Sequence, residues 1–320
     1  MFGTSPIVTA TLQYIGAATL AYAAYKLFDH VTFYLLPASS LSRYRRNPPS
    51  WAVVTGASAG IGLGAAHELA ARGFHLVLLG HLPGELDEAA EAIRAESPAV
   101  EVRIVVLDAV TATSDAIEEA LAFASTLPVT ILVNNVGGFP IAQPAIRNVA
   151  EYSGAELDRS LNINARFMAH MSRILLPRLA SSGPSLMINL SSAAKMGIPG
   201  VGPYSGCKGF IISFTTAMAR EVAATGQDVD CVAIVPGDVR TQSNQIAVTP
   251  GSPDGRQYAK VMLDRAPRAA ARGWFECKPW WSHSVTIGIL EALPSFAAQH
   301  LLLLEFDKKK KAVAQALKQR

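Results

Sequence analysis

The sequence has few cysteines, little net charge and no charged side chain before Lys26. Its three cysteines, Cys207, Cys231 and Cys277, form an odd set without metal-like spacing, which argues against a disulfide framework and fits a reducing compartment. A formal net charge of +3 over 320 residues is too small and too evenly spread to indicate a nucleic-acid-binding protein. We therefore expect neither a metal nor nucleic acid as a partner.

The missing charge leaves a long apolar segment at the N-terminus. The stretch PIVTATLQYIGAATLAYAAYKLF has about 20 uncharged residues in a row, enough to cross a bilayer as a helix. A cleaved signal peptide would need a basic start and a shorter apolar core; a helix packed on the protein's own body is the other alternative. The basic sequence RYRR at 43–46 favours the cytosolic side. We expect a single-pass anchor over 1–46 and a cytosolic domain over 47–320, with the endoplasmic reticulum as the expected membrane.

Short apolar runs alternate with Ala-rich segments of helical period from Trp51 onward. This alternation predicts an α/β fold of the Rossmann-like, doubly wound type, in which helices cover both faces of a parallel sheet. The predicted strands are 51–55, 75–79, 102–107, 130–134, 185–191 and 229–235, and the first predicted helices are 62–73 and 84–96.

A glycine-rich loop joins the first predicted strand to the first helix of this domain. It reads TGASAGIG over 55–62, and glycines at these places let the backbone turn tightly and approach a pyrophosphate, whose charge the helix N-terminus receives. The context of strand, loop and helix supports a dinucleotide site. The residues predicted to bind the cofactor here are Gly56, Ser58, Gly60, Ile61 and Gly62.

The glycine spacing, G-x-x-x-G-x-G, resembles that of the short-chain dehydrogenase/reductase family. Three later segments match the family's motifs in order: LD ending at 108, NNVG at 134–137 and PGDVRT at 236–241. The resemblance implies that Asp108 contacts the adenine and that Asn135 lies near the adenosine ribose. It also implies that Val239 and Thr241 hold the nicotinamide carboxamide and the phosphates.

The family's Y-x-x-x-K motif corresponds to Tyr204 and Lys208, which one helical turn would place on the same face. In a reduction, negative charge develops on the carbonyl oxygen and a proton must meet it. A free tyrosine, with a pKa near 10, holds its proton firmly. The resemblance implies that Lys208, with the oxidised nicotinamide, lowers the pKa of Tyr204 and holds the nicotinamide ribose.

Two further positions complete the catalytic set that the resemblance implies. A serine should orient the carbonyl: the family's usual spacing from the tyrosine selects Ser191, whereas alignment of the strand selects Ser192, which we prefer because loops absorb deletions more readily than buried strands. The helix asparagine that holds a relay water is Asn164, preferred over Asn162 by its distance from ILLP.

The end of the second predicted strand bears on the cofactor. An acidic residue there selects NAD, but the sequence has His81 and no carboxylate before Glu85. We therefore expect NADP(H), with NAD as the less favoured alternative, and we assign His81 to the cofactor site. A solvent-exposed loop residue is the other interpretation of His81.

The anchor, the NNVG variant and a long apolar tail resemble membrane-bound very-long-chain 3-oxoacyl-CoA reductases and 17β-hydroxysteroid dehydrogenases. We expect a lipophilic carbonyl substrate, a 3-oxoacyl-CoA first, with a steroid or secondary metabolite as the alternative; a non-catalytic nucleotide-binding scaffold at the membrane is a different class of hypothesis. A homodimer is a candidate assembly. A substrate loop is expected over 242–266, and Trp280 and Trp281 suit a membrane interface or core packing. The basic residues expected at the cleft rim are Lys260, Arg265, Arg268 and Arg272.

Overall fold

The computed structural model describes residues 5–37, 39–47, 49–139, 146–245 and 248–318. The chain forms two compact units, Met1–Ala38 and Ser39–Arg320. The boundary lies before the basic flank, because that flank is bonded into the second unit. The Arg43 guanidinium donates to Asp228 at 2.5 Å, and the Tyr44 hydroxyl donates to Asp230 at 2.7 Å. Tyr44 is fully buried.

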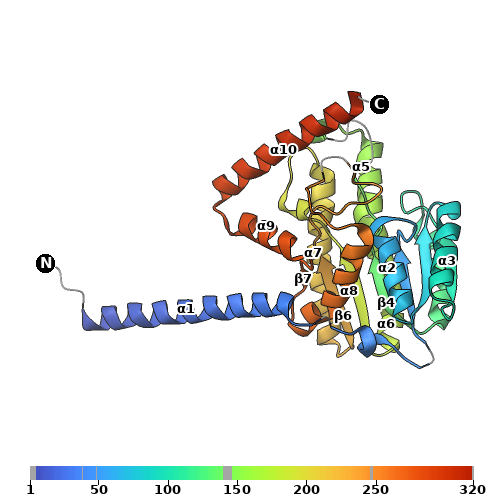
Figure 1. Cartoon of the computed structure of the whole chain (residues 1–320), viewed down its shortest axis with the longest axis horizontal. Helices are drawn as coiled ribbons and strands as arrows, with labels where there is room; N and C mark the ends of the chain where they lie inside the picture. The colour runs from blue at the N-terminus through green and yellow to red at the C-terminus, as the bar shows by residue number, and fades with distance from the viewer. Residues whose placement is uncertain (1–4, 38, 48, 140–145, 246–247, 319–320) are drawn as a thin grey trace. The chain divides into compact units, whose positions relative to one another are not determined.

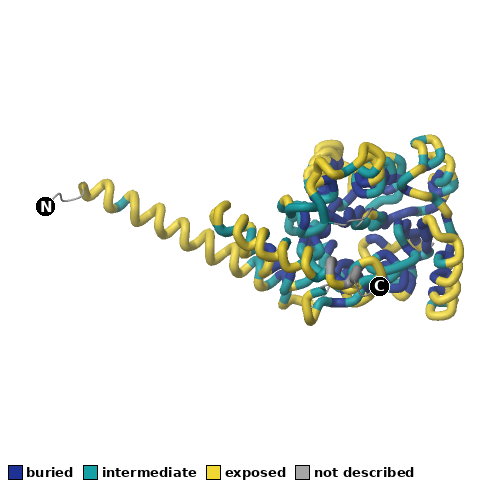
Figure 2. Tube along the Cα trace, turned by 90° about the horizontal axis from the view of Figure 1, so that it is seen from above, coloured by how far each residue is buried: buried dark blue, intermediate teal, exposed yellow. Residues whose placement is uncertain are grey.

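The first unit is one helix, α1, over Pro6–Leu35. Thirty residues at about 1.5 Å each give roughly 45 Å, more than the hydrocarbon thickness of a bilayer. Its most apolar window has a mean hydropathy of 1.3 and no buried residue. Figure 2 shows this exposure along nearly the whole helix. The expected candidate for a membrane span is therefore present as a continuous helix.

The second unit is built on a parallel sheet of seven strands in the order β3-β2-β1-β4-β5-β6-β7. Figure 1 labels β4, β6 and β7 of this sheet among the helices that cover it. All six predicted strands are confirmed. The seventh was missed because it has only two residues, too few for a periodic signal. The strands are β1 Trp51–Thr55, β2 His75–Gly80, β3 Val102–Val106, β4 Val129–Asn134, β5 Ser185–Leu190, β6 Val229–Ile234 and β7 Glu276–Cys277.

Helices cover both faces of the sheet, as predicted. On one face α2, α3 and α8 pack together; on the other, α4, α6 and α7 enclose a core in which Val53, Leu132 and Met187 are fully buried. The helices of this unit are α2 Gly60–Ala71, α3 Pro83–Glu96, α4 Ser114–Leu121, α5 Gly154–Leu161, α6 Phe167–Ser181, α7 Gly202–Ala224, α8 Gly255–Ala271, α9 Trp281–Ala292 and α10 Ser295–Lys318.

The expected substrate loop, 242–266, is partly wrong, because α8 begins at Gly255. Asp254 starts this helix with a capping box: its carboxylate accepts from the Gln257 amide, and the Gln257 side chain accepts from the Asp254 amide. Tyr258 and Met262, one turn apart, are then fully buried. The described part of the expected loop is therefore the shorter segment before Asp254, and residues 246–247 of the expected range lie outside the described residues.

Strand order changes direction between β1 and β4, whose neighbours on the sheet are β2 and β5. In open parallel sheets, the crevice beyond the carboxyl ends of such strands is where ligands bind. The glycine loop follows β1, the NNVG segment ends β4, and Ser191 and Ser192 follow β5. The topology thus brings the predicted motifs to one edge of the sheet.

Candidate active site

The glycine loop adopts the conformation that its composition predicts. Gly56 and Gly60 have φ values of +64° and +57°, in the left-handed region that favours glycine. A Cβ on Gly62 would lie only 2.0 Å from the Gly56 carbonyl oxygen, so a side chain there would collide with the loop. Ala59 precedes α2 without a side-chain cap, which leaves the first-turn amides open to an anion. These residues fit the diphosphate of a dinucleotide.

Thr55 and Asn135 join this loop to the end of β4. The buried Thr55 hydroxyl accepts from the backbone amides of Asn135 and Val136 at 2.9 and 3.0 Å. In return, the Asn135 side-chain amide donates to the carbonyls of Thr55 and Gly56, both at 3.1 Å. Asn135 therefore holds the loop in place through its side chain, and Thr55 is a positioning residue that the motif analysis missed.

Tyr204, Lys208 and Ser192 converge at the carboxyl end of β5. The Ser192 side chain lies beside the Tyr204 hydroxyl, whose pKa it lowers against the larger effect of burial. The Lys208 ammonium, buried, donates to the Leu190 carbonyl at 3.0 Å and lies 5.4 Å from the centre of the Tyr204 ring. Tyr204 is in the first turn of α7, where Gly202 and Pro203 open the helix. The predicted pair thus shares one face beside a serine.

Burial controls the ionisation of this pair. It lowers the pKa of Lys208 to about 8. It raises the pKa of Tyr204 above the usual value, although the Ser192 hydroxyl acts in the opposite direction. The lowering that the resemblance implies depends on Lys208 together with the oxidised nicotinamide, so it stays a prediction for the site with cofactor bound. Desolvation of the phenol outweighs the other influences, and Tyr204 keeps its proton at neutral pH.

The two adjacent serines point to different surroundings. Ser191 is buried, and its hydroxyl donates to the Lys208 carbonyl at 2.7 Å, so it fixes α7 against β5. Ser192 is partly accessible; besides contacting Tyr204, its hydroxyl accepts from the Ala194 amide at 3.2 Å and caps a short 3-10 turn, η5 (Ala193–Met196). The geometry thus favours Ser192 as the serine of the site, as preferred from the strand alignment.

Asn164 lies in a π-helical turn, Asn162–Arg166, between α5 and α6. Its buried side chain pairs with Gly138, accepting from the amide at 2.9 Å and donating to the carbonyl at 3.1 Å. A Cβ on Gly137 would lie 2.9 Å from Asn164 Oδ1 and 3.1 Å from Lys208 Nζ, so both side chains reach the same glycine. Asn162 instead donates to the Val110 carbonyl at 3.0 Å. The structure brings Asn164, and not Asn162, to Lys208.

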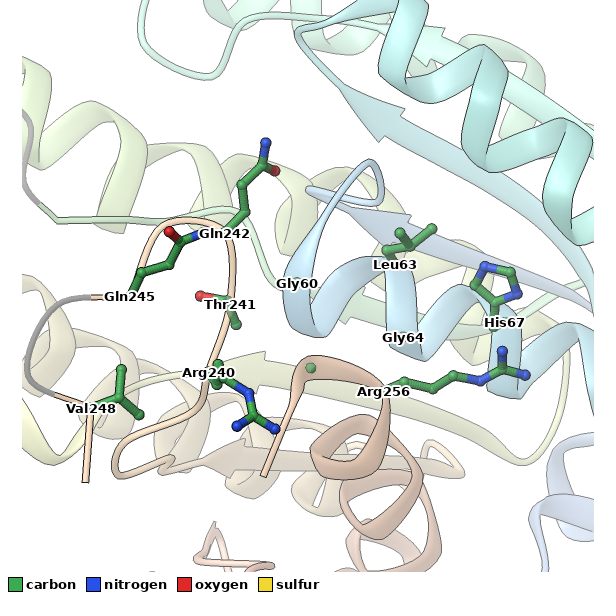
Figure 3. A pocket seen from close by; sticks show the side chains of 11 residues that line it. Gly60, Leu63, Gly64, His67, Arg240, Thr241, Gln242, Gln245, Val248 and Arg256 are labelled. Carbon is green, nitrogen blue, oxygen red and sulfur yellow. The ribbon is translucent and has the colours of Figure 1, made fainter. Parts of the chain in front are cut away.

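The loop after β6 faces the glycine loop across a pocket of about 500 Å³. Figure 3 shows Gly60 on one side and Arg240, Thr241 and Gln242 on the other. A Cβ on Gly60 would lie 3.2 Å from the Thr241 side chain. Val239 is buried, and its carbonyl accepts from Asn244 at 3.0 Å, which places its backbone and not its side chain at the turn. Of the residues predicted to bind the cofactor, Gly60 and Thr241 line this pocket.

His283 of α9 supports this loop from behind and was missed, because no local motif marks it. Its Nδ1 accepts from the Gly237 amide at 3.1 Å, and a Cβ on Gly237 would lie 2.8 Å from its ring. Burial lowers the pKa of His283. The neutral ring that this hydrogen bond requires is thereby favoured at physiological pH.

The predicted adenine-end residues are both exposed. His81 follows Gly80 at the end of β2. The Asp108 carboxylate accepts from the Val110 amide at 2.8 Å and from the Thr111 hydroxyl at 3.2 Å, which stabilises the turn after β3. Asp108 therefore has a local structural role in addition to the adenine contact that the resemblance implies.

The basic residues expected at a cleft rim lie in α8, Gly255–Ala271, and directly after it. Lys260 pairs with Asp264 at 3.3 Å, and Arg265 donates to the Pro279 carbonyl at 2.7 Å. Their place at the rim of a substrate cleft stays a prediction.

Comparisons with known proteins agree with this geometry. The short chain dehydrogenase family model matches residues 50–249, and the chain belongs to this family of oxidoreductases. A very-long-chain 3-oxoacyl-CoA reductase of Pyricularia oryzae is 30% identical over 288 residues, covering 86% of this chain and 83% of that protein. A short chain dehydrogenase structure from Pseudomonas syringae has a TM-score of 0.67 at 22% identity, over 77% of this chain and all of that one. L-sorbose reductase of Gluconobacter frateurii, solved with NADPH and L-sorbose, has a TM-score of 0.54 at 25% identity, over 60% and 71% of the two chains.

Proposed function

We propose that the protein uses NADPH to reduce a ketone on a lipophilic substrate to a secondary alcohol, with a long-chain 3-oxoacyl-CoA as the favoured substrate. One observation carries the reaction type: Ser192 and Tyr204 place two hydroxyl side chains beside each other, with the buried Lys208 ammonium 5.4 Å from the centre of the Tyr204 ring. Two adjacent hydroxyl donors suit a single acceptor oxygen that becomes more negative as it reacts.

Each side chain has a separate task in the proposed mechanism. The reduced nicotinamide, when bound, supplies a hydride to the carbonyl carbon. Ser192 donates a hydrogen bond to the carbonyl oxygen and orients it, while Tyr204 transfers its proton to that oxygen. The Lys208 ammonium stabilises the phenolate that remains and holds the cofactor ribose. Asn164, which reaches the same glycine as Lys208, retains a water that returns the proton.

The raised pKa of Tyr204 is consistent with the direction of this reaction. A phenol that is protonated at neutral pH is ready to act as an acid, which reduction requires. Oxidation of an alcohol would begin from the phenolate, whose formation burial opposes.

NADPH is favoured over NADH by the surroundings of β2. The strand ends at Gly80 and is followed by the exposed His81, and the first carboxylate after it, Glu85, already belongs to α3. A carboxylate at the strand end would repel a 2′-phosphate, whereas His81 leaves room for one. L-sorbose reductase, solved with NADPH, provides a related precedent.

A membrane-bound location follows from α1 and from the relatives. The helix is long and apolar enough for one span, and RYRR at 43–46 favours a cytosolic domain. The substrate named for the Pyricularia oryzae relative carries a very long acyl chain, which a membrane would hold. We infer the endoplasmic reticulum as the membrane in which this reductase works.

The test is NADPH oxidation by the purified full chain against 3-oxoacyl-CoAs of increasing length and a set of ketosteroids. We expect turnover with the long 3-oxoacyl-CoAs and a preference for NADPH over NADH. Tyr204→Phe, as the matched control, should lower kcat by about 10²- to 10⁴-fold because it removes only the acid. NADPH should still bind to this variant, which is measured as an increase in the fluorescence of NADPH. Turnover of ketosteroids alone would refute the substrate, and substantial activity of Tyr204→Phe would refute the acid.

A further inference from the structure

The last two helices present a surface that has no charge. From Trp281 to Leu304, Glu291 is the only Asp, Glu, Lys or Arg in the sequence. The apolar side chains of α9 recur every fourth residue and are exposed, with Trp281 at 62% and Ile289 at 55%, and Phe296 of α10 is exposed at 78%. The exposed apolar residues of the two helices are Trp281, Val285, Ile289, Phe296, Leu301, Leu303 and Leu304. We call these seven residues the apolar surface.

The opposite face of α9 is fixed to the catalytic domain. Glu291, whose side chain is 33% exposed, pairs with Lys195 at 2.7 Å and with Lys278 at 2.8 Å. Lys195 belongs to η5, directly after Ser192. The one acidic group in the stretch is therefore neutralised by these two lysines, and it does not interrupt the apolar surface.

The inner face of α10 contacts two other loops of the candidate active site. Phe306 packs on Gly200, where a Cβ would lie 2.5 Å from its ring, in the loop before Tyr204. Three residues later, Lys309 bonds to Asp238 at 3.2 Å, in the loop that faces the glycine loop. Figure 1 shows α9 and α10 as a connected pair at the end of the chain. The pair is thus held on the substrate side of the site with its apolar residues outward.

We propose that the apolar surface lies in the interface of an anionic bilayer, as a second membrane contact besides α1. The charge pattern selects lipid as the occupant, since Lys308, Lys310 and Lys311 are exposed in the part of α10 that follows Leu304, where they outnumber the exposed Glu305 and Asp307. Such basic residues beside an apolar face attract anionic headgroups, and the apolar side chains enter by about 5–10 Å. The contact turns the substrate side of the domain toward the membrane, from which an acyl chain would enter.

The test uses the full chain in vesicles of phosphatidylcholine with phosphatidylserine, carrying a polarity-sensitive fluorophore on one introduced cysteine. Val285→Cys reports on the apolar surface. Val106→Cys, at an equally exposed valine on β3, the opposite edge of the sheet, is the matched control. The native Cys207, Cys231 and Cys277 are all buried, which limits background labelling. Retained NADPH binding shows that each variant is folded.

We expect the label at 285 to shift to the blue and to be quenched several-fold more strongly by brominated lipid than the label at 106. Neutralising Lys308, Lys310 and Lys311 to glutamine should reduce that quenching while α1 keeps the chain in the vesicle. Equal quenching at 285 and 106 would overturn the proposal. A blue shift at 285 that appears in detergent without lipid and grows with protein concentration would also overturn it, because a second copy of the chain would then cover the surface.

Discussion

The cofactor side and the substrate side of the candidate site are built in different ways. On the cofactor side, the glycine loop is held by hydrogen bonds between side chains and backbone: two amides donate to the Thr55 hydroxyl, and two loop carbonyls accept from the Asn135 side chain. On the substrate side, the loop at Gly200 and the loop at Asp238, which also carries the residues predicted to hold the nicotinamide, depend on Phe306 and Lys309, about 70 to 100 residues later in the chain.

The difference shows which part of the site does not tolerate amino-acid substitution. Backbone geometry on the cofactor side admits only glycine at 62, whatever the substrate is, because its Cβ would collide with the loop itself. The substrate side is assembled from side-chain contacts with α9 and α10, which can be exchanged singly without loss of the sheet. We therefore expect substitutions near β1 and β5 to affect chemistry or cofactor binding, and those in α10 to affect substrate handling.

The strongest effect is expected for the serine pair. Ser192→Ala should lower kcat by about 10²- to 10³-fold, since it removes a donor to the reacting oxygen. Ser191→Ala, the matched neighbour, should retain most activity because its hydroxyl contacts only the Lys208 carbonyl among the groups described. Each substitution should lower the free energy of unfolding by about 1 kcal/mol. Steady-state kinetics measures kcat for both variants, and denaturant titration measures their free energy of unfolding. A larger loss of kcat in Ser191→Ala than in Ser192→Ala would assign the catalytic hydroxyl to Ser191.

Gly62→Ala should weaken the binding of NADPH. The added methyl meets the Gly56 carbonyl at 2.0 Å, so the loop must move, at a cost of about 1–3 kcal/mol that appears as a roughly tenfold or larger rise in the Kd for NADPH. Gly84→Ala, in exposed space in α3, is the control and should leave the Kd unchanged. Fluorescence titration measures both. An unchanged Kd in Gly62→Ala would show that the glycine is not part of the cofactor cradle.

Most of the sheet and the cofactor side could be predicted from the sequence because their signals are local. Six strands follow from short apolar runs, and the glycine loop and the Tyr204–Lys208 pair each lie within eight residues. The raised pKa of Tyr204 could not be predicted, since it depends on burial by distant elements. The contact of His283 with Gly237, 46 residues apart, likewise has no local pattern, and the start of α8 was missed because its capping box followed an irregular loop.

The pH dependence of reduction should distinguish Lys208 from Tyr204. Burial lowers the pKa of Lys208 to about 8, so its positive charge is present below that pH and is lost as the pH rises through it. The pKa of Tyr204 is raised above its usual value by burial, so the phenol stays protonated over the same range. We expect kcat/KM, which reports the free enzyme, to be constant below about pH 8 and to fall above it. A kcat/KM that shows no fall as the pH rises through about 8 would show that the lysine charge is not required.

The smallest effect is expected on the substrate side, at the contact between α10 and the loop after β6. Lys309→Gln removes a partly exposed ion pair with Asp238, which should lower the free energy of unfolding by less than about 1 kcal/mol. Burial raises the pKa of Asp238, but hydrogen bonds and charge from Thr249 and Lys309 outweigh it and hold the pKa below its usual value. The variant therefore leaves the Asp238 carboxylate without the positive charge of Lys309. We expect a rise of a few-fold in the KM for the carbonyl substrate with kcat nearly unchanged. Lys308→Gln, whose side chain is 77% exposed, is the control. An equal change in KM for both variants would mean that α10 acts through its overall charge and not through this contact.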